Sequence, residues 1–130
     1  MNLTGYSKRI GKGPDAGPGA EIIERTRTYL QEVGLREGVT YFDELNMEVY
    51  VATGFGLFVV SSDDQQRYVG ELTQWQDVSG CALRVGPTAA TMRSITVTIR
   101  VPEATLTERD GAPAAPLLDL FHECVKRSRP

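Results

Sequence analysis

Long hydrophobic runs are missing from this sequence: no apolar segment approaches the roughly 20 residues that a membrane-spanning helix needs. Residues 1–6 also lack the apolar core of a signal peptide. These absences predict a soluble, cytoplasmic protein that does not insert into a membrane. Apolar residues make up 41% of the chain and charged residues 24%, which is typical of a globular domain and argues against disorder.

Cysteine and histidine are scarce: the chain has two cysteines, Cys81 and Cys124, and one histidine, His122. Without a secretory signal, two reduced and buried thiols are a better interpretation than a disulfide. His122 and Cys124 are two residues apart in a predicted helix, so their side chains point about 200° apart around its axis and do not form a nucleophilic pair. Even with Cys81 added, the set falls short of the four ligands of a closed zinc site.

Motifs that mark a known chemistry are absent as well. The sequence has no Gly-x-Ser-x-Gly elbow, no His-Glu-x-x-His and no paired Cys-x-x-Cys. The glycine-rich stretch over 11–17 has no preceding strand and no Gly-Lys-Ser/Thr, so it does not match a phosphate-binding loop. We therefore expect neither an enzyme nor a bound metal ion or cofactor.

Charge is close to balanced, with a net charge of −3. The acidic residues of the middle of the chain do not follow the alternating spacing of a calcium loop, and we interpret them as solvated turns: Asp43, Glu44, Glu48, Asp63 and Asp64. Basic residues gather near both ends, but acidic neighbours interrupt the first group and helix capping explains the second: Lys8, Arg9, Lys12, Lys126, Arg127 and Arg129. We therefore do not expect nucleic acid as the partner.

Residues 1–20 are rich in glycine and proline, and we interpret them as a flexible, locally basic arm that orders on contact with a partner or with the domain. Residues 21–130 then form a single α+β domain. An amphipathic helix is predicted over 21–33, with Gly34 as a left-handed cap and Leu35 as the hydrophobic contact of that cap. This helix covers one face or edge of a sheet. Its apolar face consists of Ile22, Ile23, Thr26, Leu30 and Val33.

From residue 39 the pattern changes to the period of strands. The predicted strands cover 47–52, 57–60, 67–75, 81–85 and 94–101, and the short segment 39–42 adds a sixth strand if it pairs. Consecutive apolar residues over 57–60 indicate a strand covered on both faces. Gly70 indicates a β-bulge or the close approach of another backbone. Each strand pairs with the preceding one, so we expect an antiparallel meander of five or six strands, either a curved sheet or a partly closed barrel.

The last part of the chain is predicted as a loop over 103–115 followed by an amphipathic helix from about Pro116 to Arg127. The basic residues at the carboxyl end of this helix agree with the helix dipole. Its apolar stripe consists of Leu117, Leu118, Phe121, Cys124 and Val125.

Aromatic residues gather in the strand-rich middle, where three of them are candidate binding residues: Phe55, Tyr50 and Trp75. Phe55 lies in the glycine-flanked turn over 53–56, where it either anchors a partner or folds back over the sheet. Trp75 ends a strand that faces the closing helix, which favours the core over a contact with a partner.

A meander of strands closed by one amphipathic carboxyl-terminal helix resembles the pleckstrin-homology-like superfold, in particular its small bacterial domains. The resemblance covers residues 39–127: 67–78 looks like a central strand pair, 94–101 like a late strand and 116–127 like the helix that plugs the barrel end. The helix over 21–33 departs from the simplest version, and the turn over 53–56 lacks the basic cluster of a phosphoinositide site. A cystatin-like or secretion-chaperone-like α+β sheet is the rival fold; those folds also mostly bind proteins or peptides.

The leading hypothesis is a small non-catalytic module that binds another protein or a peptide, as an adaptor, chaperone or inhibitor, through a sheet edge, the turn aromatics and the arm. A homodimer is a further option. The alternative is a small-molecule-binding protein or enzyme with a pocket between the sheet and the closing helix. A cavity with converging polar residues such as Arg84, Arg100 or His122 would favour the alternative, whereas a dry core with an exposed apolar patch would favour protein binding.

Overall fold

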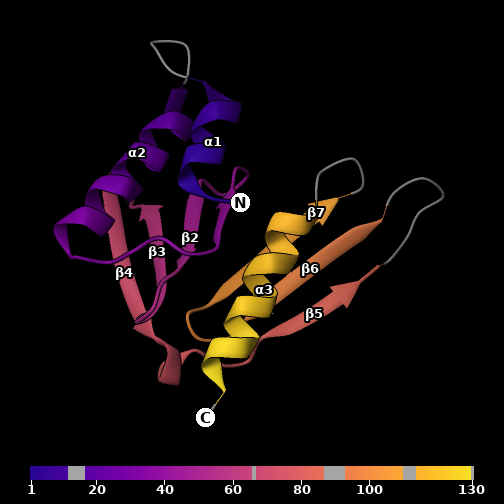
Figure 1. Cartoon of the computed structure of the whole chain (residues 1–130). Coiled ribbons are helices and arrows are strands. Elements are labelled where there is room, and N and C mark those ends of the chain that lie inside the picture. Colours follow the sequence, from indigo (N-terminus) through magenta and orange to yellow (C-terminus); the bar gives the residue numbers. More distant parts are fainter. Residues whose placement is uncertain (12–16, 66, 87–92, 110–113, 130) are drawn as a thin grey trace.

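The computed structural model describes residues 1–11, 17–65, 67–86, 93–109 and 114–129 (Figure 1). In these ranges none of the helices is long and apolar enough to cross a membrane. The described elements are, in chain order, α1 (Leu3–Ile10), α2 (Gly17–Glu32), β1 (Thr40–Asp43), β2 (Glu48–Ala52), β3 (Gly56–Ser62), β4 (Tyr68–Gln74), the 3-10 helix η1 (Trp75–Asp77), β5 (Ala82–Val85), β6 (Ser94–Ile99), β7 (Ala104–Arg109) and α3 (Ala115–Ser128).

The strands form two antiparallel sheets, one of four strands in the order β1-β2-β3-β4 and one of three in the order β5-β6-β7. The antiparallel α+β class is confirmed, but the expected single meander of five or six strands is wrong, and the sheet does not close into a barrel. The chain leaves the first sheet at η1, where Trp75 and Val78 turn inward and are buried. This turn replaces the ladder that would have joined β4 to β5.

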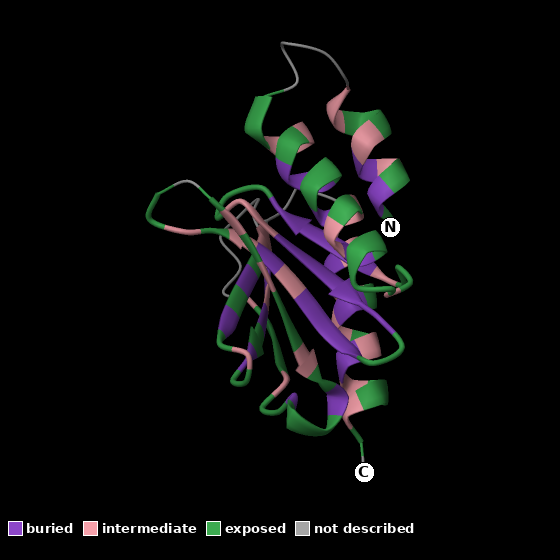
Figure 2. Cartoon of the chain, turned by 90° about the vertical axis from the view of Figure 1, so that its left-hand side faces the viewer, coloured by how far each residue is buried: buried purple, intermediate pink, exposed green. Residues whose placement is uncertain are grey.

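Helices and the second sheet cover opposite faces of the four-stranded sheet. In β2 and β3 the side chains alternate between two cores, and buried residues follow strands of the first sheet in Figure 2. One core joins α1 and α2 to Phe42, Val49, Val51, Phe58 and Val60. The other joins α3 and the three-stranded sheet to Tyr41, Tyr50, Ala52 and Leu57. The prediction that the 57–60 strand is covered on both faces is confirmed.

Part of the amino-terminal segment, which was expected to be a flexible arm that orders on contact with a partner or with the domain, is a helix packed on the domain. Residues 3–10 form α1, whose first turn is capped because the Asn2 side chain accepts the Gly5 N–H at 2.8 Å. Leu3 and Tyr6 are buried against the first sheet, and the Met1 carbonyl accepts the N–H of Thr40 at 3.0 Å. Leu3 and Tyr6 are three residues apart, which is a helical spacing, so both side chains lie on one packed face although the segment is rich in glycine. Residues 17–20 begin α2, and 12–16 lie outside the described residues.

The predicted cap of α2 is confirmed. Gly34 has a φ of 72°, and the N–H of Leu35 bonds to the carbonyl of Leu30 at 2.9 Å. Val33, however, lies just past the helix and is exposed, so its predicted place on the apolar face is wrong. The apolar face therefore ends at Leu30.

Strand β7 was missed, because its residues were assigned to a loop. Ala104 and Leu106 are buried and alternate with exposed Thr105 and Thr107, which is a period-2 pattern. The neighbouring prolines and the Asp-Gly pair favoured a loop over a strand in the sequence. Residues 110–113 of the predicted loop lie outside the described ranges. The last helix forms as α3, with Leu117, Leu120 and Cys124 buried.

Gly70 does not mark a bulge, because β3 and β4 pair without interruption from Gly56–Gln74 to Ser62–Tyr68. The close approach is instead made by aromatic side chains. A Cβ atom at Gly70 would lie 2.6 Å from the ring of Phe58 and 3.2 Å from that of Tyr29. Glycine at this position lets the two rings pack against the backbone of β4.

Candidate binding surfaces and cavities

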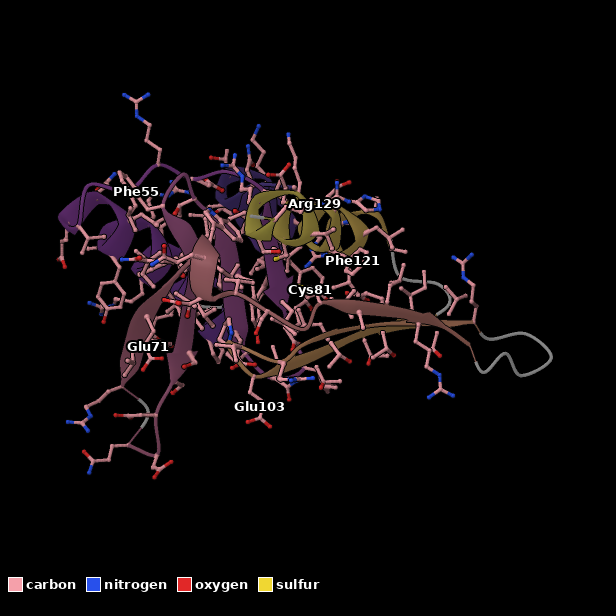
Figure 3. The ribbon with its side chains drawn as sticks, turned by 90° about the horizontal axis from the view of Figure 1, so that it is seen from below. Phe55, Glu71, Cys81, Glu103, Phe121 and Arg129 are labelled. Atoms are coloured by element: carbon pink, nitrogen blue, oxygen red, sulfur yellow. The ribbon has the colours of Figure 1, made fainter. Side chains whose placement is uncertain are left out.

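Phe55 lies on the surface at the turn between β2 and β3, and the residue is 70% exposed (Figure 3). The turn is held by Thr53, whose hydroxyl donates to the Gly56 carbonyl at 2.8 Å and accepts the N–H groups of Phe55 and Gly56 at 3.2 and 3.1 Å. The ring therefore does not fold back over the sheet. A large apolar side chain held outward by a fixed turn is suited to contact with another molecule.

Trp75 lies behind this turn rather than beside Phe55 on the surface. Its ring is buried, and its indole N–H donates to the carbonyl of Thr53 at 2.8 Å. The guanidinium of Arg127, from α3, lies 6.0 Å from the ring centroid. Trp75 thus fixes the turn that carries Phe55, and the two candidate residues are linked through Thr53.

Tyr50, the third candidate, belongs to a different part of the molecule. It is buried, and its hydroxyl donates to the carboxylate of Glu48 at 3.1 Å. Burial and the nearby Glu48 carboxylate raise the pKa of the Tyr50 hydroxyl, and burial also raises the pKa of Glu48. Both residues line a groove of about 230 Å³ that also includes Glu71 and Glu103, which Figure 3 labels.

This groove is acidic, with carboxylates from Glu48, Glu71 and Glu103. Within the described ranges, no group of three or more histidine, cysteine, aspartate or glutamate residues lies close enough to hold an ion. Its other lining residues are neutral: Val59, Ser61, Thr73 and Pro102.

A larger cavity, of about 370 Å³, lies between the edges of the two sheets, and we call it the seam cavity. Tyr41 of β1 reaches across it and donates a hydrogen bond to the carboxylate of Glu108 on β7. Burial, followed by the hydrogen bond to Glu108, raises the pKa of the Tyr41 hydroxyl. Its remaining lining comes from α1 and the start of the chain, from β1 and the turn after it, from β7 and from the first turn of α3: Met1, Tyr6, Arg9, Phe42, Asp43, Glu44, Leu45, Thr107 and Pro116.

Sequence reasoning missed the seam cavity. Tyr41 and Glu108 are 67 residues apart, and the second of them belongs to the strand that was assigned to a loop. The helical spacing of Leu3 and Tyr6 was the available signal that α1 packs near this edge.

Convergence of Arg84, Arg100 or His122 on a cavity would have favoured small-molecule binding. Arg84, Arg100 and His122 are exposed and line neither of these two cavities. The ring of His122 instead lies at 5.8 Å from that of Phe121 on α3. The seam cavity touches α3 only at Pro116, so it does not lie under the body of the closing helix.

The two cysteines are free thiols, with Cys124 buried and Cys81 half-buried. Burial, with smaller contributions from Cys81 and Glu123, raises the pKa of Cys124 to about 12. Burial also raises the pKa of Cys81. Neither thiol is therefore ionised near neutral pH, which is the opposite of an activated nucleophile.

Comparisons with protein-family models, with curated proteins and with solved structures return no match for this chain. The small α+β architecture with antiparallel sheets and a carboxyl-terminal helix is compatible with the pleckstrin-homology-like superfold.

Proposed function

We propose that this chain is a small, non-catalytic, cytoplasmic protein-binding module, an adaptor, chaperone or inhibitor, that accepts an extended segment of a partner at the edge of β5. The observation that carries the proposal is the exposure of this strand. All four residues of β5 are exposed, and no other segment in the described part of the chain pairs with its outer edge. A partner strand at this edge would gain affinity from main-chain hydrogen bonds.

The register of β5 identifies the open backbone groups. The N–H of Gly86, just after the strand, donates to the carbonyl of Ser94 at 2.8 Å, so this residue faces β6. In an antiparallel ladder, residues that bond to the neighbour alternate with residues whose N–H and C=O point away from it. Leu83 and Val85, at odd distances from Gly86, therefore direct their backbone groups toward the open edge.

The side chains of the same two residues continue the core face of the second sheet into solvent. Leu83 pairs with Val97, which pairs with Leu106, and cross-strand partners share a face. Val97 and Leu106 are buried, whereas Leu83 is 39% and Val85 63% exposed. A partner strand with apolar residues at alternate positions would cover both side chains.

The positive charge of the region around β5 and β6 favours an acidic segment as the partner. Residues 79–102 carry three arginines and no acidic residue, whereas residues 40–78 carry seven acidic residues and one arginine. The three arginines, Arg84, Arg93 and Arg100, are exposed on β5, β6 and their flanks. Because complementary charge steers association and penalises partners of like charge, a segment that alternates apolar and acidic residues fits this edge best.

The test is capture of a partner from native lysate by the tagged full chain, at low and high salt, in parallel with variants. Arg84→Glu and Val85→Asp should each lose a protein that the wild type and Arg36→Glu, an exposed charge reversal on the loop after α2, retain. In the complex, the amides of Leu83 and Val85 should exchange more slowly with solvent, and that of Arg84, which faces β6, should not change. Equal capture by all variants would refute the β5 site.

Phe55 is proposed as a second contact, separate from β5. Phe55→Ala should weaken partner capture and leave thermal stability nearly unchanged, because the ring is exposed. A large loss of stability would instead show that the ring belongs to the core. Tyr50 and Trp75, which are buried, would act in binding only by supporting neighbouring residues.

Membership of the pleckstrin-homology-like superfold is a further part of this proposal. It is supported by the succession of antiparallel strands over 40–109 and by α3, which follows them and contacts β1, β2 and η1. Helices α1 and α2 lie outside that pattern and cover the other face of the first sheet.

A small-molecule-binding protein is the second candidate function. The specific observation in its favour is the seam cavity, which has the size of a small ligand site and combines aromatic walls with a few polar groups. This candidate does not depend on the β5 edge, which lies on the other side of the second sheet from β7.

A further inference from the structure

The walls of the seam cavity are aromatic. Tyr6, Tyr41 and Phe42 line it, and the rings of Tyr6 and Phe42 meet edge to face with centroids 5.9 Å apart. All three side chains are buried: Tyr6 and Phe42 in the core that joins α1 to the first sheet, and Tyr41 in the core on the opposite face, with α3 and the second sheet. A cavity of about 370 Å³ with such walls fits a compact molecule with one ring or a short alkyl body.

Charge in the cavity is negative, with carboxylates from Asp43, Glu44 and Glu108 against the single guanidinium of Arg9 among the described lining residues. Arg9 forms an ion pair with Glu44, and its guanidinium lies 5.2 Å from the ring centroid of Tyr6. These two charges therefore compensate each other at the rim.

The two remaining carboxylates differ in their partners. Asp43 accepts the backbone N–H of Asn46 at 3.3 Å and its side-chain amide at 2.9 Å, so it serves the turn after β1. Glu108 accepts a hydrogen bond only from the neutral hydroxyl of Tyr41 among the described groups. Its negative charge, placed beside an aromatic wall, lacks a compensating cation in the described structure.

We propose that the seam cavity binds a small organic cation, a primary amine with an apolar or aromatic body, whose ammonium lies against the Glu108 carboxylate. This inference rests on the second candidate function, small-molecule binding, and not on the β5 edge. An ammonium donates up to three hydrogen bonds, and Glu108 and the oxygen of Tyr41 both accept. The aromatic walls add a favourable contact with the cation and cover the apolar body.

The experiment compares three probes of nearly the same shape on the full chain: phenethylamine, the neutral 2-phenylethanol and the anionic 3-phenylpropionate. Binding is followed by calorimetry and by NMR shifts of isotope-labelled protein. Phenethylamine should bind and shift the signals of Tyr6, Tyr41 and Glu108. The alcohol and the carboxylate should bind at least about tenfold more weakly, which corresponds to roughly 1.4 kcal/mol.

Substitutions then test whether the carboxylate of Glu108 is the group that binds the ammonium. Glu108→Gln, which still accepts the hydrogen bond from Tyr41, should weaken phenethylamine binding about tenfold or more. Glu32→Gln, on the exposed end of α2, should leave binding unchanged and controls for the loss of one negative charge. Arg84→Glu should also leave it unchanged, so failure of the β5 proposal is separated from failure of this one.

Several outcomes would overturn the proposal. Equal binding of the alcohol and the amine would show that the cavity recognises shape alone, and tighter binding of the carboxylate would make it an anion site at Arg9. No binding of phenethylamine at about 10 mM would exclude this class of ligand. An unchanged affinity in Glu108→Gln, with the fold confirmed by NMR, would remove Glu108 from the site.

Discussion

The two sheets of this protein differ in how they are buried. The four-stranded sheet lies between helices on one face and α3 with the second sheet on the other, and every residue of β1 is buried. The three-stranded sheet is covered on one face only, and every residue of its edge strand β5 is exposed. The first sheet is buried most deeply at β1, β2 and β3, whereas its edge strand β4 has no buried residue and, like β5, pairs with no further strand in the described part of the chain.

Charge follows the same division. The segment of the first sheet is strongly acidic, whereas the β5–β6 hairpin carries only arginine among its charged residues. Like charges along one surface disfavour association between copies of that surface and steer partners of opposite sign. In the proposal made above, the first sheet supplies stability and the second sheet recognition, and four tests can break or sharpen this comparison.

The largest effect is expected in the core between the helices and the first sheet. Phe58→Ala removes a buried ring that packs against Gly70 and the α2 side of the sheet, and should lower the free energy of unfolding by about 3–5 kcal/mol. Urea unfolding of the full chain measures this. A cost below about 1 kcal/mol would mean that the first sheet does not depend on its helical cover.

Two leucine-to-alanine substitutions in one row of cross-strand partners test whether the contribution of burial to stability falls from β7 to β5. Leu106→Ala, at a residue that is 1% exposed, should cost about 2–5 kcal/mol, and Leu83→Ala, at 39% exposed, less than about 1 kcal/mol. Both leucines face the same core through Val97. Equal costs in urea unfolding would show that the β5 edge is covered in solution.

Gly70→Ala tests the close packing of aromatic rings on β4. The new methyl group would lie 2.6 Å from the ring of Phe58, so the rings must shift, at a cost of about 1–3 kcal/mol. Gly54→Ala is the control, because a Cβ atom there meets nothing within 4 Å. In a double-mutant cycle with Phe58→Leu the cost of Gly70→Ala should fall; additive costs would exclude the ring as the cause.

The smallest expected effect is a gain in stability rather than a loss. Burial raises the pKa of Glu48 above its ordinary value of 4.5, so the protonated side chain is favoured in the folded state and this contribution is lost as pH rises through the raised pKa. Glu48→Gln keeps an acceptor for Tyr50 without the charge. It should raise the melting temperature slightly at pH 7.

This stabilisation should disappear below the ordinary pKa of 4.5, where the wild-type carboxyl is protonated in both states. Glu32→Gln, on the exposed end of α2, controls for the change in net charge. A gain that is the same at pH 4 and pH 7 would show that burial of the Glu48 charge is not its source.

Several elements followed from local patterns in the sequence. The alternation in 94–99, the continuous apolar run of β3, the cap at Gly34 and the apolar stripe of α3 each depend on residues close together in the chain. Periodicity and turn chemistry fix these features because the backbone conformation of a segment is largely a local property. The α+β class and the turn over 53–56 follow from the same signals, whereas the sequence left open whether Phe55 is exposed.

The split into two sheets, the place of α1 on the first sheet and the pairing of β7 with β6 were decided by contacts between distant residues, although the local periods of α1 and β7 are present in the sequence. Three contacts join segments whose sequence neighbours give no sign of the pairing: the hydrogen bond from the Trp75 indole to Thr53, the hydrogen bond from the Thr40 N–H to the Met1 carbonyl, and the hydrogen bond from Tyr41 to Glu108. The open edge at Leu83 and the seam cavity exist only because of these contacts. A period in the sequence tells which face of a strand is apolar, but the free energy of burial decides which strand or helix covers it.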